Sequence, residues 1–153
     1  MSKITLSISL NEAKILYKEA TLERKLELEE LFPELKPQLI TDRVKTYEDA
    51  LKVLGREDFS HENLYPREIA RRKLEIIIEA LNEGWKPDWE NYSQLKWYPY
   101  FYGSFAGLWY SSAIHSPALA TAYFGVRLCC KSEEISDYVG QKFLDLYKEM
   151  FLG

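Results

Sequence analysis

The chain has 153 residues, a formal net charge of −4, and 46% hydrophobic and 29% charged residues. This length and composition fit one folded domain and argue against intrinsic disorder. The acidic balance disfavours a general polyanion-binding protein, although the segment 85–131 has four basic and two acidic residues, or about +2. Tyrosine is abundant, with 11 residues, and such side chains are typical of half-buried sheets and interfaces.

The sequence also indicates where the protein resides. Its start, MSKITLSISL, lacks the long apolar stretch of a secretory signal. Cys129 and Cys130 are adjacent, so on a strand they would point to opposite faces, and two reduced thiols are the simplest interpretation. The segment 97–126 has no Asp, Glu, Lys or Arg, but Pro99, Pro117 and many tyrosines interrupt it. We therefore expect a cytoplasmic protein without a membrane span.

Capping signals mark the first elements. Alternating apolar residues in 4–8 predict a short strand. Ser9 and Glu12 then have capping-box spacing for a helix over 11–19. Leucines at helical spacing predict a second helix over about 22–31.

The central part of the chain is predicted to be helical after a linker. Residues 33–45 are expected to have little secondary structure. Thr46 and Asp49 open a short helix that ends at Gly55, where a left-handed backbone needs no Cβ. The clearest helix runs over 66–83, with apolar residues along one face.

Three strand candidates follow, over about 96–102, 107–114 and 120–130, with connections short enough for a meander. Ser132 then caps a final helix to about residue 151. The predicted fold class is therefore α+β. It consists of an antiparallel meander sheet of about three strands packed against several helices, including a long central and a C-terminal helix, and the N-terminal strand is an open addition to the sheet.

No internal repeat divides the chain, so we expect a single α+β domain over 1–153. Its N-terminal part, 1–64, would be helical. The rest, 65–153, would hold the central helix, the aromatic sheet and the C-terminal helix.

Period-two counting divides the strands into an inner face toward the helices and an outer face. In the middle strand, Leu108, Tyr110 and Ile114 are expected on the inner face, and Ala113 on the outer face. The third strand would contribute an inner set of small and apolar residues, namely Ala122, Phe124, Val126, Leu128 and Cys130.

The outer face of this predicted sheet is rich in aromatic residues. The candidate binding residues are Tyr98, Tyr100, Tyr102, Trp109, Tyr123 and Arg127. A large exposed aromatic patch marks an interaction site. Tyrosines paired across strands also stabilise a sheet, and the N-terminal helices or a second subunit could cover this face. The sequence leaves both interpretations open.

Residues that could carry catalysis are few. Cys129 and Cys130 have no local signature that ties them to His61 or His115 as a nucleophile–base pair. A zinc site needs four ligands, usually in paired spacing, and that pattern is absent from the sequence. We therefore expect no catalytic residue, no metal site and no cofactor, and keep a small enzyme that uses Cys129 or His115 as an alternative.

Single-stranded nucleic-acid binding is a second alternative, because such proteins stack bases on aromatic side chains in a positive groove. Lys86, Lys96, Arg127 and Lys131 lie near the aromatic segment in the sequence. Because these basic residues are few and the chain is acidic, nucleic acid is the less favoured partner.

Four blocks of the sequence point to one group of proteins. They are KTYEDALKVLG (45–55), ALNEGWKPDW (80–89), KWYPYF (96–101) and GVRLCCKSEEISDYVGQKFLDLYKEMF (125–151), and together they cover about half to two thirds of the chain. These blocks resemble a group of small uncharacterised proteins that recur in phages and prophages of Bacteroidetes. The resemblance implies a phage-related context and a bacterial cytoplasm, leaves virion association open, and carries over no catalytic residues.

These observations favour a non-enzymatic binding or accessory protein of phage or prophage origin. Its interaction surface would be the aromatic sheet face, or the loop and edge strand over 85–102. Its partner would be a protein or a small ligand, and a second copy of the chain is an open choice.

Overall fold

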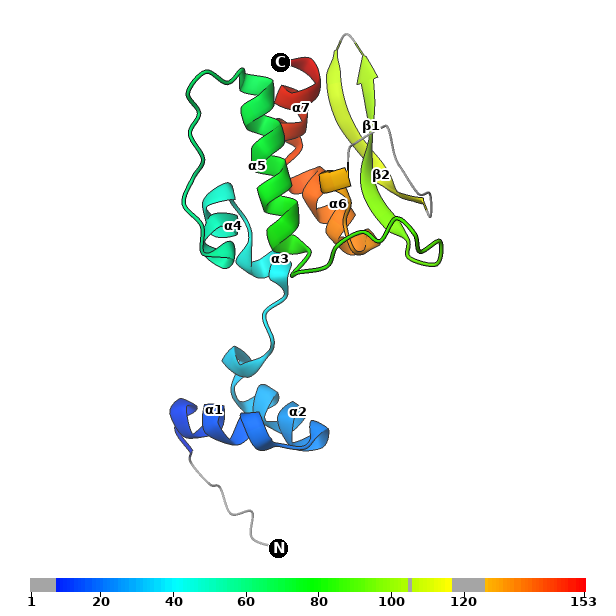
Figure 1. Cartoon of the computed structure of the whole chain (residues 1–153). Coiled ribbons are helices and arrows are strands. Elements are labelled where there is room, and N and C mark those ends of the chain that lie inside the picture. The colour runs from blue at the N-terminus through cyan, green and yellow to red at the C-terminus, as the bar shows by residue number, and fades with distance from the viewer. Residues whose placement is uncertain (1–7, 105, 117–125) are drawn as a thin grey trace, which may run out of the picture. The chain divides into compact units, whose positions relative to one another are not determined.

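The computed structural model describes residues 8–104, 106–116 and 126–153. Within these ranges the chain forms seven α-helices and one two-stranded antiparallel sheet, which confirms the mixed α and β content (Figure 1). The chain divides into two compact units, Met1–Gln38 and Leu39–Gly153, each with its own packing. The expected single domain stays a prediction.

The first unit contains two short helices, α1 (Leu10–Glu19) and α2 (Leu22–Leu31). The predicted capping box is present at α1, where the Glu12 amide donates to Ser9 Oγ at 3.3 Å and the Ser9 amide donates to Glu12 Oε2 at 2.8 Å. The ends of both helices agree with the sequence prediction to within one residue. The strand expected over 4–8 falls almost entirely outside the described residues.

A few side chains hold α1 and α2 together. Ala13 of α1 and Leu28 of α2 are buried. The Tyr17 hydroxyl donates a hydrogen bond to the Glu29 carboxylate, which links the two helices.

The segment 33–45 is not the plain linker that we expected. It contains a 3-10 helix, η1 (Pro33–Leu35), and a short helix, α3 (Ile40–Arg43). Ile40 and Val44 are buried in the core of the second unit. Burial of these apolar side chains orders a segment whose composition alone suggests a loop.

Two further helices of the second unit follow the capping signals. The helix α4 (Tyr47–Leu54) begins with the Thr46 capping box and ends at Gly55, whose φ of +63° is left-handed. The central helix α5 (Pro66–Leu81) has proline at its first position, where the missing N–H has no intrahelical partner to lose.

The predicted C-terminal helix is two helices, α6 (Glu133–Lys142) and α7 (Leu144–Leu152). The break lies at Phe143, which is buried and has φ −111° and ψ 28°. The helix α6 contacts both strands of the sheet, while α7 contacts α5 and also β2. The single C-terminal helix that we expected is therefore wrong, because the backbone at Phe143 leaves the helical conformation.

The sheet is a hairpin of β1 (Lys96–Ser104) and β2 (Gly107–Ser116). The third strand that we expected over 120–130 is not seen. Among its described residues, Val126–Leu128 form a 3-10 helix, η2, and Cys130 forms only an isolated bridge to Trp97. Cys129 is described but belongs to no helix or strand, and residues 120–125 lie outside the described ranges.

An irregularity in the hairpin changes the predicted faces. Tyr100 pairs with Ser112 but Phe101 pairs with Tyr110, so Ser111 is an extra residue on β2. Leu108 and Tyr110 face the helices as expected, but beyond the bulge the alternation is reversed. Cross-strand partners share a face.

The reversal exchanges two residues. Ala113 pairs with the buried Pro99 and so takes the inner face, while Ile114 pairs with Tyr98 on the outer face. The predicted placement of Ala113 and Ile114 is therefore wrong. The physical reason is the bulge, because period-two counting assumes an unbroken ladder.

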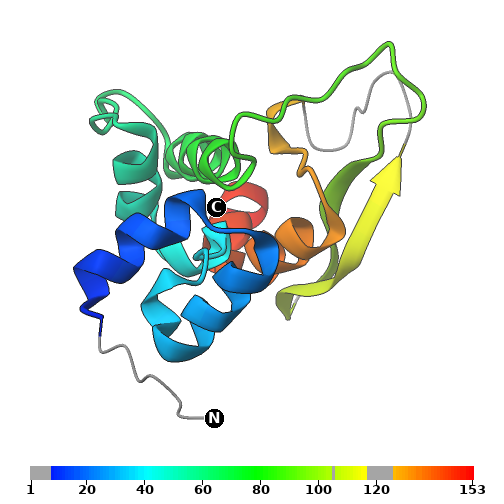
Figure 2. The same ribbon diagram turned by 90° about the horizontal axis from the view of Figure 1, so that it is seen from below.

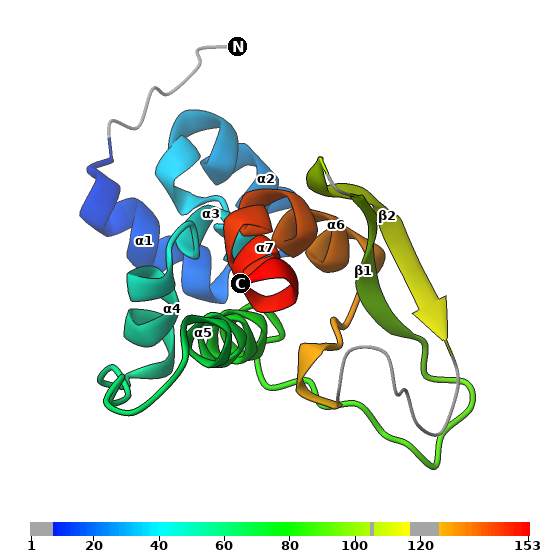
Figure 3. The same cartoon turned by 90° about the horizontal axis from the view of Figure 1, so that it is seen from above.

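The helix α6 packs directly on the inner face of the hairpin (Figure 2 and Figure 3). The contact is close at Gly140. A Cβ at this position would lie 2.6 Å from the Tyr110 ring and 2.7 Å from Pro99 Cβ. The Tyr110 hydroxyl also donates to the Asp137 carboxylate, which fixes the ring beside the helix.

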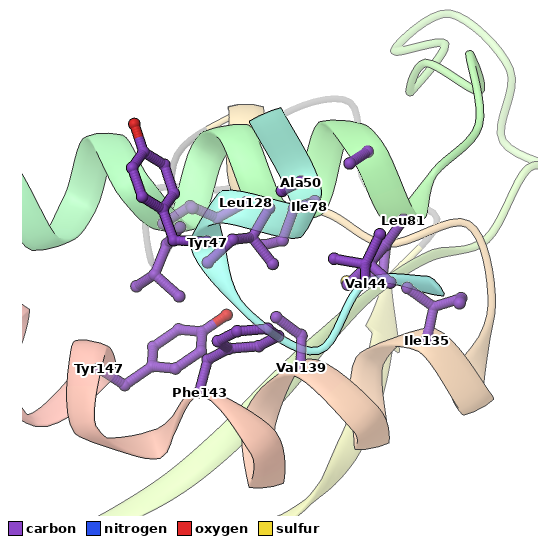
Figure 4. Packing of buried hydrophobic residues seen from close by; sticks show 14 of the residues in the cluster. Val44, Tyr47, Ala50, Ile78, Leu81, Leu128, Ile135, Val139, Phe143 and Tyr147 are labelled. Carbon is purple, nitrogen blue, oxygen red and sulfur yellow. The ribbon is translucent and has the colours of Figure 1, made fainter. Parts of the chain in front are cut away.

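The main core lies between α5 on one side and α6 and α7 on the other (Figure 4). Ile78 and Leu81 of α5 face Val139, Phe143 and Tyr147 in this view. All five side chains are buried. Each large apolar side chain stabilises the fold by about 1.5–3 kcal/mol relative to exposure.

A buried amide connects α5 to the segment that leads into α6. Asn82, at the end of α5, donates from Nδ2 to the Cys129 carbonyl at 2.8 Å, and its Oδ1 accepts from the Lys131 amide at 2.9 Å. Between these residues, Cys130 exchanges two backbone hydrogen bonds with Trp97 of β1, at 2.6 and 3.1 Å. We call this set of bonds the Asn82 link.

The close contact of α6 with the hairpin gives a stability prediction. Replacing Gly140 with alanine should lower the free energy of unfolding, because overpacking of this kind costs about 1–3 kcal/mol. Because three side-chain atoms lie within 2.7 Å of the added Cβ, we expect the upper part of this range, which exceeds the roughly 1 kcal/mol that alanine gains over glycine within a helix. Urea unfolding measures the difference, and Gln141→Ala, at the exposed neighbouring position, is the matched control. Equal stability of the Gly140→Ala variant and the wild type would show that the contact is not tight.

Candidate functional site

Three aromatic side chains stand together on the outer face of the hairpin. Tyr100, Tyr102 and Trp109 are 41%, 53% and 46% exposed. The Tyr100 and Tyr102 rings lie 5.7 Å apart in an edge-on arrangement, and the Tyr102 ring lies 6.4 Å from Trp109, its partner across the strands. We call these residues the aromatic trio.

Strand alternation on β1 and one cross-strand pair explain why these three share one face. Tyr100 and Tyr102 are two residues apart on β1 and so point the same way. Trp109 lies before the bulge and pairs with Tyr102, which places it on that same face. The opposite face holds Phe101, whose ring lies 4.6 Å from Tyr147 in the core.

The structure does not bring all six predicted residues together. Tyr98 is on the outer face but only 7% exposed. Tyr123 lies outside the described residues. Arg127 belongs to η2 rather than to the sheet, and its Nη1 lies 4.0 Å from Glu75 Oε2 of α5. The outer face that the structure describes is therefore smaller than the predicted one.

The outer face carries no formal charge in the hairpin. Lys96 is the only Lys, Arg, Asp or Glu between residues 96 and 116. It is fully buried, its Nζ donates to the Asn91 carbonyl at 2.9 Å, and it lies 5.6 Å from the Trp89 ring centroid. These contacts satisfy the buried cation and keep it away from solvent.

A second feature, which the sequence analysis missed, is a cavity of about 920 Å³ beside α5. Its lining includes Arg72 of α5, the tryptophans Trp85 and Trp89 of the loop after α5, and Arg127. The signal in the sequence was the block GWKPDW, in which two tryptophans flank a lysine and a proline, but its neighbours in space come from distant parts of the chain.

Cys129 and Cys130 are both buried and form no disulfide, so each carries a thiol. Burial raises the pKa of the Cys129 thiol from 9.0 to about 11, against a smaller lowering effect of Lys96. Burial also raises the pKa of Cys130 far above its ordinary value, and the neighbouring Cys129 adds to this. A nucleophilic cysteine needs the opposite shift. Both cysteines are buried although the predicted strand would have put them on opposite faces.

Both histidines contact residues other than the cysteines. His61 Nε2 lies 3.4 Å from Asp58 Oδ2, and His115 packs its ring 4.6 Å from that of Trp97. Over the ranges that the structure describes, no three His, Cys, Asp or Glu side chains cluster in a way that could hold a metal ion.

Comparisons with protein-family models, with curated proteins and with solved structures find no match. The resemblance to phage and prophage proteins therefore stays an expectation. In the described part of the chain, no helix combines the length and the apolar character needed to cross a membrane.

The raised pKa values predict how stability depends on pH. Because the folded chain keeps protons on its thiols that the unfolded chain loses near pH 9, the free energy of unfolding should fall as the pH rises from about 9 to about 11. Urea unfolding across this range measures the effect, and Cys129→Ala should show a smaller loss. Rapid labelling of Cys129 by iodoacetamide in the native chain at about pH 8 would contradict the placement of this thiol.

Proposed function

We propose that the chain is a non-enzymatic binding protein that uses the aromatic trio to contact a protein partner. The observation that carries the proposal is the exposure of three large aromatic side chains, side by side, on the sheet face opposite α6. Tyr and Trp dominate binding hot spots because they offer large, rigid contact areas with polar tips.

The size of the trio indicates the strength of the contact. If each aromatic side chain offers roughly 200 Å², the exposed fractions of Tyr100, Tyr102 and Trp109 amount to roughly 300 Å². A standard protein interface buries about 800 Å² on each partner. The trio therefore suits the centre of a weak or transient contact, with surrounding residues as its rim.

Charge decides what kind of partner fits this face. Proteins bind nucleic acids largely through Lys and Arg side chains that contact the phosphates. Lys96, the only Lys or Arg of the hairpin, is buried, and its ammonium group contacts the Asn91 carbonyl and the Trp89 ring. An uncharged protein surface with apolar groups and a few hydrogen-bonding groups complements the trio better. Single-stranded nucleic acid is accordingly not the proposed partner.

The resemblance to proteins of Bacteroidetes phages and prophages supplies the biological setting of the proposal. In that setting the protein acts in the bacterial cytoplasm, and its partner is another phage protein or a host protein. The support for this setting is the likeness of the four sequence blocks alone.

The test compares variants of the full chain as bait. Tyr100→Ala combined with Trp109→Ala should weaken partner binding at least about tenfold, because hot-spot aromatics contribute about 2 kcal/mol or more each. Tyr92→Ala, an exposed tyrosine outside the hairpin, is the matched control and should bind like the wild type. Proteins captured from a Bacteroidetes lysate are identified by mass spectrometry, and the best candidate is purified and titrated by calorimetry.

Three results would count against the proposal. A purified partner could bind the double variant as tightly as the wild type. Sedimentation velocity could show that the trio serves only self-association. The double variant could unfold, which would mean that the trio supports the fold rather than a contact.

A further inference from the structure

The cavity beside α5 has the size of a small-molecule site. Its volume of about 920 Å³ lies within the range of about 300–1,000 Å³ that is typical of ligand pockets. Its lining comes from the end of α4 and the segment after it, from one side of α5 and its end, from residues 84–89 and from the residues around η2. The buried side chains of Asn82 and Cys129 belong to this lining, so part of it is held by the Asn82 link.

Aromatic side chains form part of the lining. Trp85, Trp89 and Phe59 belong to the lining and are all half-buried. Aromatic walls of this kind favour flat ring systems, which stack on them with about 1–3 kcal/mol per ring in nucleic-acid complexes.

The lining has an excess of positive charge, unlike the chain as a whole. It contains four basic residues and two acidic residues, a net charge of +2, whereas the whole chain carries −4. The basic members are Arg56, Arg72, Lys86 and Arg127, and the acidic members are Glu75 and Glu79.

The ion pairs of the lining leave some of these cations available. Arg56 forms a two-pronged pair with Glu79, with N–O distances of 2.6 and 2.7 Å. The Arg127 side chain is 80% exposed, and its Nη1 lies 4.0 Å from Glu75 Oε2, a long distance for an ion pair. Arg72 lies 5.7 Å from the Phe59 ring and has no carboxylate partner among the residues that the structure describes.

We propose that this cavity binds a flat aromatic anion of mononucleotide size. Its ring would stack on the tryptophan walls, and its anionic group would be bound by Arg72 and Arg127, whose guanidinium groups suit phosphate and carboxylate oxygens. An uncharged apolar ligand fits less well, because it would remove water from Arg72 without replacing the lost hydrogen bonds.

This site does not depend on the aromatic trio. The trio lies on the hairpin and the cavity beside α5, and they share no residue. Loss of one function therefore leaves the other open to measurement. The Tyr100→Ala and Trp109→Ala double variant should retain ligand binding in the cavity.

The test is a titration of the full chain with AMP, GMP, CMP and UMP at low salt. Binding is measured by tryptophan fluorescence and by calorimetry. At least one monophosphate should bind with a Kd below about 1 mM. Its nucleoside and inorganic phosphate, tested separately, should each bind at least about tenfold more weakly, because each offers only half of the proposed contacts. Arg72→Gln should weaken binding at least about tenfold.

Arg67→Gln is the matched control, since Arg67 lies on α5 but is not part of the cavity lining. It removes the same charge from the same helix and should leave the affinity unchanged. The proposal is overturned if none of the four monophosphates binds below about 1 mM, if the nucleoside alone binds as tightly, or if Arg67→Gln weakens binding as much as Arg72→Gln.

Discussion

The Asn82 link is the interaction on which the arrangement of the second unit depends. One buried amide side chain satisfies the Cys129 carbonyl and the Lys131 amide, and the residue between them pairs with Trp97 of β1. A buried donor or acceptor that loses its partner costs about 1–3 kcal/mol. The end of α5 is thus connected, through a short segment, to the first strand of the hairpin.

This connection positions both proposed surfaces. On one side, Cys130 and Trp97 fix the start of β1, so α6 covers the inner face and the aromatic trio stays outside. On the other side, Asn82 and Cys129 line the cavity beside α5. The two surfaces are therefore built on one shared support but use separate side chains. A protein can hold a small anion and contact a partner independently with such an arrangement.

Local signals predicted much of the secondary structure, whereas long-range packing decided the rest. The capping box at Ser9 and the left-handed Gly55 depend on neighbours in sequence, so pattern reading found them. The extra residue Ser111 and the break at Phe143 depend on what each element packs against. Strand alternation predicted the trio but not the burial of Tyr98, and the cavity is lined by residues far apart in the chain.

The most direct measurement of the central claim is amide hydrogen exchange of Lys131 in the native state. Because its N–H donates to the buried Asn82 Oδ1, we expect exchange as slow as that of core amides such as Ile78, and at least about 100-fold acceleration in Asn82→Ala while Ile78 stays slow. Exchange of Lys131 at the rate of an open chain in the wild type would contradict the account, since the link would then hold neither the hairpin nor the cavity wall.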